Sequence, residues 1–320
     1  MKISRAQRAL GYKSDCAIAR EYYFEFGSDY NLRLDKKGVI GKLLTRISAF
    51  VTFAFMYDVF HFHVKSILPG MLDIPLLRIF GKKIIFQYHG LELKGIFNSE
   101  EILLLKEKGY KGFRLLEARL SYNIVKRFSH AVLVSTPDLL TYAPHAIWIP
   151  QPTDLDYWNI SDEKNNNVSP NIIKICHAPS IKSRKGTEYL VSAVEQLKSD
   201  GHNIELIIVN NIPYKEVKKY LEQADIFVDQ LLVGWYGNAS CEAMALMKPV
   251  CAYIRPDLIK YLDGCPIVNT DSENLIEMLK MLIENPSIRS DLGRLSREYV
   301  KNRHSLNEIA IHLIDIYKKF

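Results

Sequence analysis

The chain has 320 residues, of which 48% are hydrophobic and 24% charged, and its formal net charge is +6. These values are typical of a globular protein and exclude a disordered chain or a fibre. The length favours two domains over one. The five cysteines are an odd number without close pairs. They indicate buried thiols in a reducing compartment, not a disulfide framework or a zinc site.

The first fifty residues are basic, with ten Lys or Arg against five Asp or Glu. A solvated basic face is the simplest interpretation, and a surface that meets anionic lipid or an acidic acceptor is the alternative. No nucleic-acid-binding motif accompanies the charge, so nucleic acid is not an expected partner. The most apolar stretch, Ile47–Met56, is too short to cross a bilayer, and no signal peptide is recognisable. The sequence predicts a soluble cytoplasmic protein, which in the lipid-facing interpretation lies peripherally at the inner face of the membrane.

Short apolar runs alternate with amphipathic helical stretches, as in parallel βαβ units. The chain begins with a predicted helix, Ser4–Leu10, followed by Gly11. The rest of the first series comprises strands at 13–19, 58–63, 82–89, 130–135 and 146–149 and helices at 72–80 and 113–128. The strand and glycine-rich turn that should precede the first helix are absent. We therefore expect either that the natural protein extends upstream of Met1 or that the N-terminal sheet closes up with one strand fewer.

The polar stretch Ser161–Pro170 is predicted as a linker to a second α/β series. That series comprises strands at 172–177, 204–209, 226–229, 250–254 and 267–269, and helices at 187–199, 214–223, 239–246, 272–284, 287–301 and 305–319. Together the two series predict an α/β protein with two Rossmann-like domains facing each other across a cleft, an acceptor-side domain at 1–155 and a nucleotide-sugar-binding domain at 156–320. Ligands of such sheets bind outside the carboxyl ends of the strands.

In the stretch from 225 to 250, a strand runs into a turn with two glycines, and a helix starts at Asn238 or Ala239, just after Gly237. The exposed amides at a helix N-terminus form a site for a diphosphate. Glu242, one turn into this helix, could accept hydrogen bonds from ribose hydroxyls. The alternative is an ordinary strand-turn-helix whose Glu is favoured by the helix dipole.

A basic loop follows the strand that ends at His177, and it carries Lys182, Arg184 and Lys185 before the next helix. Fixed cations at this place could stabilise the negative charge that grows on a leaving diphosphate, without a metal ion. A solvated basic loop is the alternative. We therefore expect no metal and no cofactor, with a nucleotide-sugar donor as co-substrate.

These two stretches resemble the donor site of family 4 retaining glycosyltransferases, which have the GT-B fold. In that family Glu-x7-Glu is followed by Ala-Met-Ala and a Pro-Val strand, as Glu242 is here. The resemblance covers residues 58–320. It implies that Glu242 holds the nucleotide ribose, that Lys185 faces the donor diphosphate, and that the last helix, 305–320, crosses back onto the N-terminal domain.

The sequence departs from this family at the first Glu of the motif, which contacts the donor hexose and is replaced by Gly234. Asp229 or Gln230 could supply a substitute polar group, and each could instead simply end a strand. This departure leaves the donor sugar and the stereochemistry open.

Histidines mark the ends of two strands in the first series. His61 and His63 point to one face of their strand, and no third ligand has a spacing that would complete a metal site. The next strand ends in His89, which the resemblance implies reaches the donor sugar, and a satisfied loop histidine is the alternative. His63 is a further candidate for contact with the donor sugar or the acceptor.

The resemblance implies a hexosyltransferase that moves a hexose from a nucleotide-diphosphate sugar to a saccharide or lipid-linked acceptor, with retention and without a metal, in polysaccharide or cell-envelope synthesis. One alternative is a non-catalytic GT-B protein that binds a nucleotide-sugar or a partner glycosyltransferase. A nucleotide-sugar epimerase shares the fold, but its pattern of acids and histidine is not recognisable in the sequence.

Overall fold

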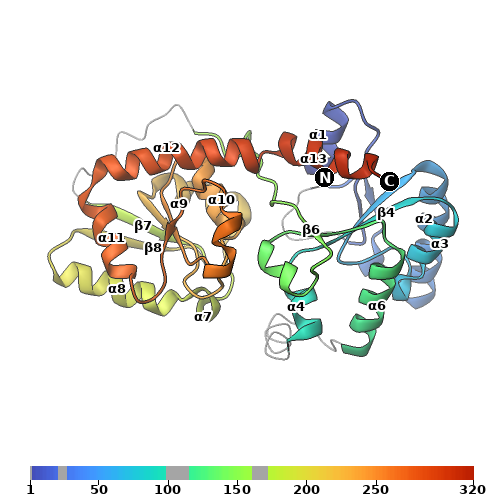
Figure 1. Cartoon of the computed structure of the whole chain (residues 1–320), viewed down its shortest axis with the longest axis horizontal. Helices are drawn as coiled ribbons and strands as arrows, with labels where there is room; N and C mark the ends of the chain where they lie inside the picture. Colours follow the sequence, from blue (N-terminus) through green and yellow to red (C-terminus); the bar gives the residue numbers. More distant parts are fainter. Residues whose placement is uncertain (1, 21–26, 99–114, 161–171) are drawn as a thin grey trace. The chain divides into compact units, whose positions relative to one another are not determined.

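The computed structural model describes residues 2–20, 27–98, 115–160 and 172–320 (Figure 1). The chain splits into two compact units. Unit 1 comprises Met1–Gln151 and Ile309–Phe320, and unit 2 comprises Pro152–Glu308. The division falls a few residues before the predicted boundary at 155. The predicted linker, 161–170, lies outside the described residues.

The helices and strands of unit 1 are α1 (Lys2–Ala9), β1 (Ala17–Ile18), β2 (Tyr30–Asn31), α2 (Val39–Met56), β3 (Val59–His63), α3 (Asp73–Ile79), β4 (Lys83–Tyr88), α4 (Leu91–Phe97), α6 (Leu115–Phe128), β5 (Ala131–Val134), β6 (Ile147–Trp148) and most of α13 (Leu306–Lys318). Its main sheet is parallel, with the strand order β3-β4-β5-β6. Residues 113 and 114 of the predicted 113–128 helix lie outside the described residues.

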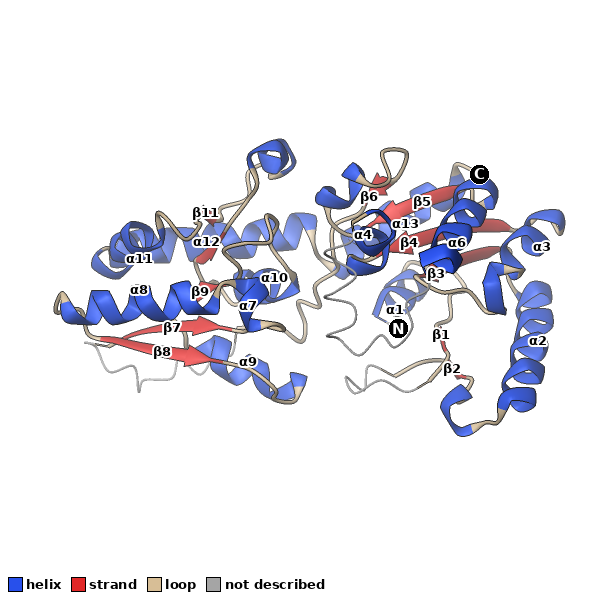
Figure 2. Cartoon of the chain, turned by 90° about the horizontal axis from the view of Figure 1, so that it is seen from below, coloured by secondary structure: helices blue, strands red, loops and turns tan. Residues whose placement is uncertain are grey.

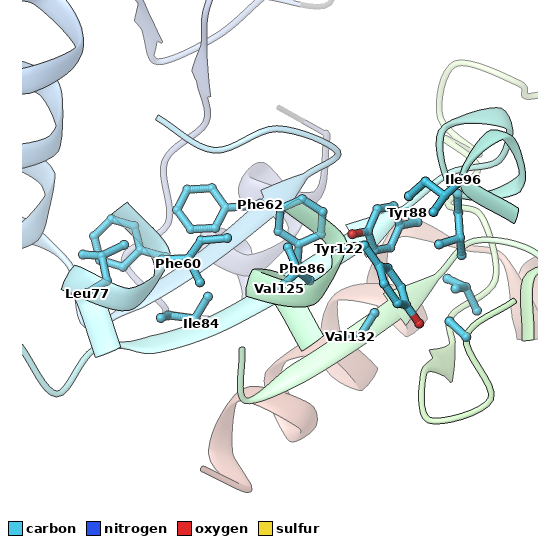
Figure 3. Close-up of a cluster of buried hydrophobic side chains, with 14 of the residues drawn as sticks. Phe60, Phe62, Leu77, Ile84, Phe86, Tyr88, Ile96, Tyr122, Val125 and Val132 are labelled. Atoms are coloured by element: carbon cyan, nitrogen blue, oxygen red, sulfur yellow. The ribbon is translucent and has the colours of Figure 1, made fainter. Parts of the chain in front are cut away.

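Alternation along β3 and β4 divides the core of unit 1 between two faces of the sheet. Phe60, Phe62 and Phe86 point to one face, where they pack in a cluster with α2, α3 and α6 (Figure 3). Ile85 of β4 points to the other face, where it packs with Ile309 and further residues of α13. Because β3 alternates in the same way, its two histidines lie on the α13 side.

The N-terminal region differs from the prediction. The predicted strand Lys13–Ala19 is reduced to Ala17–Ile18, which pairs in parallel with Tyr30–Asn31 in a separate two-stranded sheet. The backbone of the preceding residues instead meets polar side chains of its neighbours: the N–H of Cys16 donates to Asp29 (2.8 Å). Among the described residues no strand precedes β1, and β3 forms one edge of the main sheet.

Helix α2 corrects two sequence-based expectations, since no helix was predicted there and no segment was judged able to cross a membrane. The 18 residues from Val39 to Met56 have a mean hydropathy of 1.5, and 17% of these residues are buried. By length and composition this helix could span a bilayer. Lys42 and Arg46 interrupt the apolar run in the sequence, but the helix continues through them and keeps a high mean hydropathy.

Unit 2 contains β7 (Ile173–His177), α7 (Lys182–Lys185), α8 (Thr187–Ser199), β8 (Ile204–Ile208), α9 (Tyr214–Gln223), β9 (Ile226–Val228), α10 (Asn238–Ala245), β10 (Val250–Ala252), β11 (Val268–Asn269), α11 (Leu275–Glu284) and α12 (Pro286–Arg303). Its parallel sheet has the order β11-β10-β9-β7-β8, and Figure 2 labels β11, β9, β7 and β8 of this sheet. The predicted elements of this half agree closely with these bounds. Short 3-10 helices lie at 34–36, 69–71, 137–141 and 256–261.

All five cysteines are free. Cys176, Cys241 and Cys251 are buried as expected, whereas Cys16 and Cys265 are only half-buried. Burial raises the pKa of the Cys176 thiol to about 12.

Candidate functional site

The strand order of unit 2 indicates which edge of its sheet would bind a ligand. From β7 the chain moves outward to the edge strand β8, and β9 then lies on the other side of β7. The order therefore reverses between β7 and β9, and in open α/β sheets ligands bind outside the carboxyl ends of the strands at such a switch point. The segments that follow these two strands carry Lys185 and Asp229.

Lys185 and Asp229 form a buried ion pair, with 2.5 Å between Lys185 Nζ and Asp229 Oδ1. The Asp229 side chain is 1% exposed, and its second oxygen accepts hydrogen bonds from the N–H of Gly237 and the hydroxyl of Ser240, both at 2.7 Å. Burial alone would raise the pKa of Asp229. The Lys185 charge and these hydrogen bonds outweigh burial and lower it.

The ion pair places a cation at the start of α10. A Cβ on Gly237, the N-cap residue of this helix, would lie 3.5 Å from Lys185 Nζ and 3.2 Å from Asp229 Oδ2. Asn238 is exposed and Ala239 half-buried in the first turn that follows. Helix N-terminus and ammonium group thus converge at one place, an arrangement suited to an anion.

Gly186 holds Lys185 in position. It has φ 76°, in the left-handed region that ends α7, and its missing Cβ would lie 3.0 Å from Leu231 Cβ. The carbonyl of Lys185 accepts the N–H of Leu231 (3.1 Å), which ties α7 to the segment after β9. Lys182 is exposed and Arg184 half-buried on the same helical turn.

His177 stabilises this framework from within β7. Its Nδ1 pairs with the carbonyl of Val228 (2.8 Å) and its Nε2 with the hydroxyl of Thr187 (2.8 Å), the first residue of α8. Burial lowers the pKa of His177. This fully buried side chain therefore joins both switch-point strands to a helix and is not available to a ligand.

Glu242 lies one turn into α10, where Tyr214 donates a hydrogen bond to its Oε1 (2.6 Å). Trp158 in turn donates to the Tyr214 hydroxyl (3.2 Å), and the Tyr157 and Tyr214 rings are stacked. Burial and the Glu242 carboxylate raise the pKa of Tyr214 well above its ordinary value. This aromatic support was not predicted, because its members are far apart in the sequence.

The backbone at Gly234 explains why a Glu is absent there. Gly234 has φ 90°, and an added Cβ would lie 3.2 Å from Cβ of Arg255. Gln230 is fully buried and shapes the same loop, accepting the N–H of Gly234 (3.2 Å) and donating to the carbonyl of Trp235 (3.2 Å). With Asp229 bound to Lys185, both proposed substitutes for the missing Glu are engaged within the protein.

In unit 1 the carboxyl ends of β3, β4 and β5 carry a hydrogen-bonded polar chain. His63 Nδ1 lies 2.9 Å from His89 Nε2, and His89 Nδ1 lies 2.7 Å from Ser135 Oγ. The rings of His63 and His89 are stacked with centroids 5.2 Å apart. Both histidines were predicted as candidate site residues, whereas the contact between them was not predicted.

The partners of Ser135 fix the direction of these hydrogen bonds. Ser135 Oγ receives the amide of Gln87 (3.1 Å) and donates to the carbonyl of Tyr88 (3.2 Å). His89 Nδ1–H then donates to Ser135, so His89 Nε2 is an acceptor and His63 Nδ1–H is its donor. The remaining nitrogen, His63 Nε2, carries a lone pair and accepts no hydrogen bond from the described residues.

His61 stacks on His63 with ring centroids 4.5 Å apart, and its Nδ1 lies 2.7 Å from the hydroxyl of Tyr317 on α13. Burial, followed by the His89 imidazole, lowers the pKa of His61 to about 3. The His63 side chain is exposed at the end of β3, but desolvation of its stacked ring, followed by the imidazoles of His61 and His89, lowers the pKa of His63. The His61 and His63 imidazoles are therefore neutral at pH 7. Among the described residues no group of three His, Cys, Asp or Glu is arranged to hold a metal ion.

No protein-family model matches the chain. A curated protein, the diadenylate cyclase of Methanocaldococcus jannaschii, is 26% identical over 211 residues, which is 62% of this chain. The chain spans 64% of the length of that relative.

Solved structures match more extensively. Sucrose-phosphate synthase from Thermosynechococcus elongatus is similar over 99% of this chain and 91% of that one, with TM-score 0.68 and 17% identity. The catalytic domain of starch synthase IV from Arabidopsis thaliana is similar over 87% of this chain and 76% of that one, with TM-score 0.60 and 12% identity. UDP-GlcNAc 2-epimerase from Neisseria meningitidis is similar over 100% of this chain and 97% of that one, with TM-score 0.54 and 15% identity. At these identities the likeness shows the fold: this chain has the GT-B fold, with two Rossmann-like α/β units.

Proposed function

We propose that the protein is a glycosyltransferase that moves a hexose from a nucleotide-diphosphate sugar to a saccharide or lipid-linked acceptor. The observation that carries this proposal is the Lys185 ammonium, held by Asp229 beside the N-terminus of α10 at the switch point of the sheet. Glu242 lies one turn along the same helix, where it would receive the ribose hydroxyls. The named ligands of two similar structures, ADP and UDP-GlcNAc, support a nucleotide at this place.

In the proposed reaction the bond between the sugar anomeric carbon and the diphosphate oxygen breaks, and the electron pair leaves with the diphosphate. The α10 amides and Lys185, with Lys182 and Arg184 on the same turn, would stabilise that developing charge. The bond that forms joins the anomeric carbon to an acceptor hydroxyl oxygen, and the proton of that hydroxyl passes to the leaving diphosphate. Retention of configuration is part of the proposal.

His63 is proposed to act on the acceptor side, because its Nε2 is an unused acceptor on a neutral ring. It would receive a hydrogen bond from a sugar hydroxyl, while His89 and Ser135 orient the ring. This assignment shifts the direct contact from His89, as the resemblance implied, to His63. We expect His63→Ala to lower turnover at least as much as His89→Ala, and Ser135→Ala to lower it less; the reverse order would contradict the assignment.

The central test is transfer or hydrolysis measured with a panel of UDP-, GDP- and ADP-sugars. Lys185→Ala should cut turnover by roughly a hundredfold or more, as does loss of one oxyanion-stabilising donor. Lys198→Ala, which removes a lysine from the far end of α8, is the matched control and should leave turnover unchanged. Unaltered turnover and nucleotide affinity in Lys185→Ala would refute the site.

The same panel separates the alternatives. Nucleotide binding without turnover would favour a non-catalytic GT-B protein, and an epimerised nucleotide-sugar would favour the epimerase class. ATP is included because of the diadenylate cyclase match. Because fixed cations replace the metal in this proposal, turnover should persist in excess EDTA; loss with rescue by Mg²⁺ or Mn²⁺ would contradict it.

A further inference from the structure

The outward face of α2 is apolar. Its exposed side chains recur at spacings of four, three, four and four residues, which places them on one side of a helix. They are Ile40 (76% exposed), Leu44 (61%), Ile47 (44%), Val51 (46%) and Phe55 (86%), called the α2 stripe below. The inward side, with Phe50 and Phe53, is buried in the core of unit 1. A surface helix of a soluble protein normally presents polar residues outward, so the α2 stripe marks an interaction surface.

The neighbouring helix enlarges the apolar surface. Phe50 on α2 and Phe80, just past α3, have ring centroids 6.5 Å apart, and both views show α2 beside α3 at the periphery of unit 1 (Figures 1 and 2). Phe80 is 56% exposed and Ile79 77% exposed. Large exposed side chains on two adjacent helices exceed the scattered apolar residues of an ordinary surface.

The charges at the N-terminal end of the α2 stripe are mainly basic. Lys36 and Lys37 come just before α2, with Asp35 preceding them, whereas Lys42 and Arg46 lie on the side of the helix opposite the α2 stripe, where Arg46 donates to the carbonyl of Ile67. Lys37 donates to Thr45 (2.6 Å), which keeps its ammonium group at the start of the helix. An apolar surface with basic residues fits an anionic lipid bilayer, whereas a second copy would bring like charges together.

The core contacts of α2 favour an in-plane orientation over a membrane-spanning one. Phe50 and Phe53 are each at most 8% exposed, and the Phe53 ring contacts Tyr30 with centroids 5.1 Å apart. A helix crossing the bilayer would have to leave the core that these residues help to form. A docked helix keeps them buried and offers only the opposite face to lipid.

We propose that α2 docks unit 1 onto anionic membranes, lying in the plane of the interface with the α2 stripe in the headgroup–acyl boundary. This places the earlier expectation of membrane contact on a defined surface. The proposal does not rest on glycosyl transfer, because lipid binding can be measured without donor or acceptor.

The test is co-sedimentation of the full chain with vesicles of phosphatidylcholine alone or mixed with phosphatidylglycerol. We expect binding to the mixed vesicles that weakens with salt. Ile40→Ser combined with Phe55→Ser should reduce it at least tenfold, since two large side chains no longer enter the interface. Lys36→Gln combined with Lys37→Gln should reduce it roughly fivefold per charge removed. Leu295→Ser, which alters an exposed apolar residue on α12 of unit 2, is the matched control.

Each outcome decides the proposal. Circular dichroism establishes that the variants are folded, and the two α2 positions are exposed enough for serine to be tolerated. Equal sedimentation of the wild type and the Ile40→Ser, Phe55→Ser variant would overturn the proposal. Equal binding of the wild type to vesicles with and without phosphatidylglycerol would also overturn it. A concentration-dependent dimer that the same variant abolishes would assign the α2 stripe to a second copy. Wild-type protein that resists extraction at high salt and alkaline pH would indicate a spanning helix. Loss of turnover with intact sedimentation would refute only the proposed function.

Discussion

Replacing Lys185 by methionine removes the cation from the buried pair while keeping much of the side-chain volume. The Asp229 carboxylate would remain 1% exposed, with the Gly237 N–H and the Ser240 hydroxyl as its donors. Removing one partner of a buried ion pair costs about 3–5 kcal/mol. Lys185 is itself 17% exposed, so water screens part of the interaction, and we expect a loss of about 3 kcal/mol in the unfolding free energy at pH 7.

The loss should depend on pH in a defined direction. In the wild type the pKa of Asp229 is lowered, so the charged carboxylate adds stability above its unfolded pKa of about 3.9, and this is lost as pH falls through the folded value. Without Lys185, burial raises the pKa of Asp229 instead. The variant then regains stability relative to wild type as pH falls from 7 to 4, because its carboxyl group becomes neutral.

Urea unfolding followed by tryptophan fluorescence measures both effects. A Trp148→Phe background leaves Trp158 and Trp235 as the reporters, both in unit 2. Lys182→Met, on the exposed side of α7, is the control and should cost less than about 0.5 kcal/mol.

A double-mutant cycle with Asp229→Asn isolates the pair, and we expect a coupling energy of about 2 kcal/mol. A coupling below about 0.5 kcal/mol, or a Lys185→Met loss that is equal at pH 7 and pH 4, would refute the reasoning.

Three further predictions concern other sites. Gly234→Ala should destabilise unit 2 by roughly 1–2 kcal/mol, measured by the same unfolding assay, because the residue has a positive φ; an unchanged midpoint would contradict this. Tyr214→Phe should raise the KM for the nucleotide-sugar about fivefold with less than a twofold change in kcat, since Glu242 loses one hydrogen bond; an unchanged KM would separate Glu242 from the donor. His61 alone should cost unit 1 about 2 kcal/mol between pH 7 and pH 5, because its folded pKa is about 3 and it therefore takes up a proton mainly when unfolded. His61→Phe should reduce the pH dependence by this amount when unfolding is followed by Trp148 fluorescence, leaving the part that comes from His63, and an unchanged slope would contradict the prediction.

The sequence was most informative where local pattern and topology agree. In unit 2 the run around Phe227 is short, apolar and fully buried, the run around Ile175 is buried from Ile175 onward, and both were predicted as strands. In unit 1 the predicted strand at 13–19 is mostly irregular. Local propensity could not show that Asp29 would take the N–H of Cys16.

Helix α2 was missed because the helical signal depends on polar residues facing outward. Its outward face is apolar, so the sequence reads as one apolar run broken by Lys42 and Arg46. The same limit applies to the candidate site. Lys185 and Asp229 are 44 residues apart, and only the strand order brings them together.

Most of helix α13 belongs to unit 1 but is translated after unit 2. Ile309, Leu313 and Ile316 cover Ile85 and Leu133 of the sheet, yet all of unit 2 is translated between the two groups. At typical elongation rates that interval is about 10–30 s. During it one face of the nascent N-terminal sheet stays open, which exposes it to chaperones and to aggregation. The fold of unit 1 is therefore completed only once Ile309, Leu313 and Ile316 have left the ribosome, after unit 2 has had time to form.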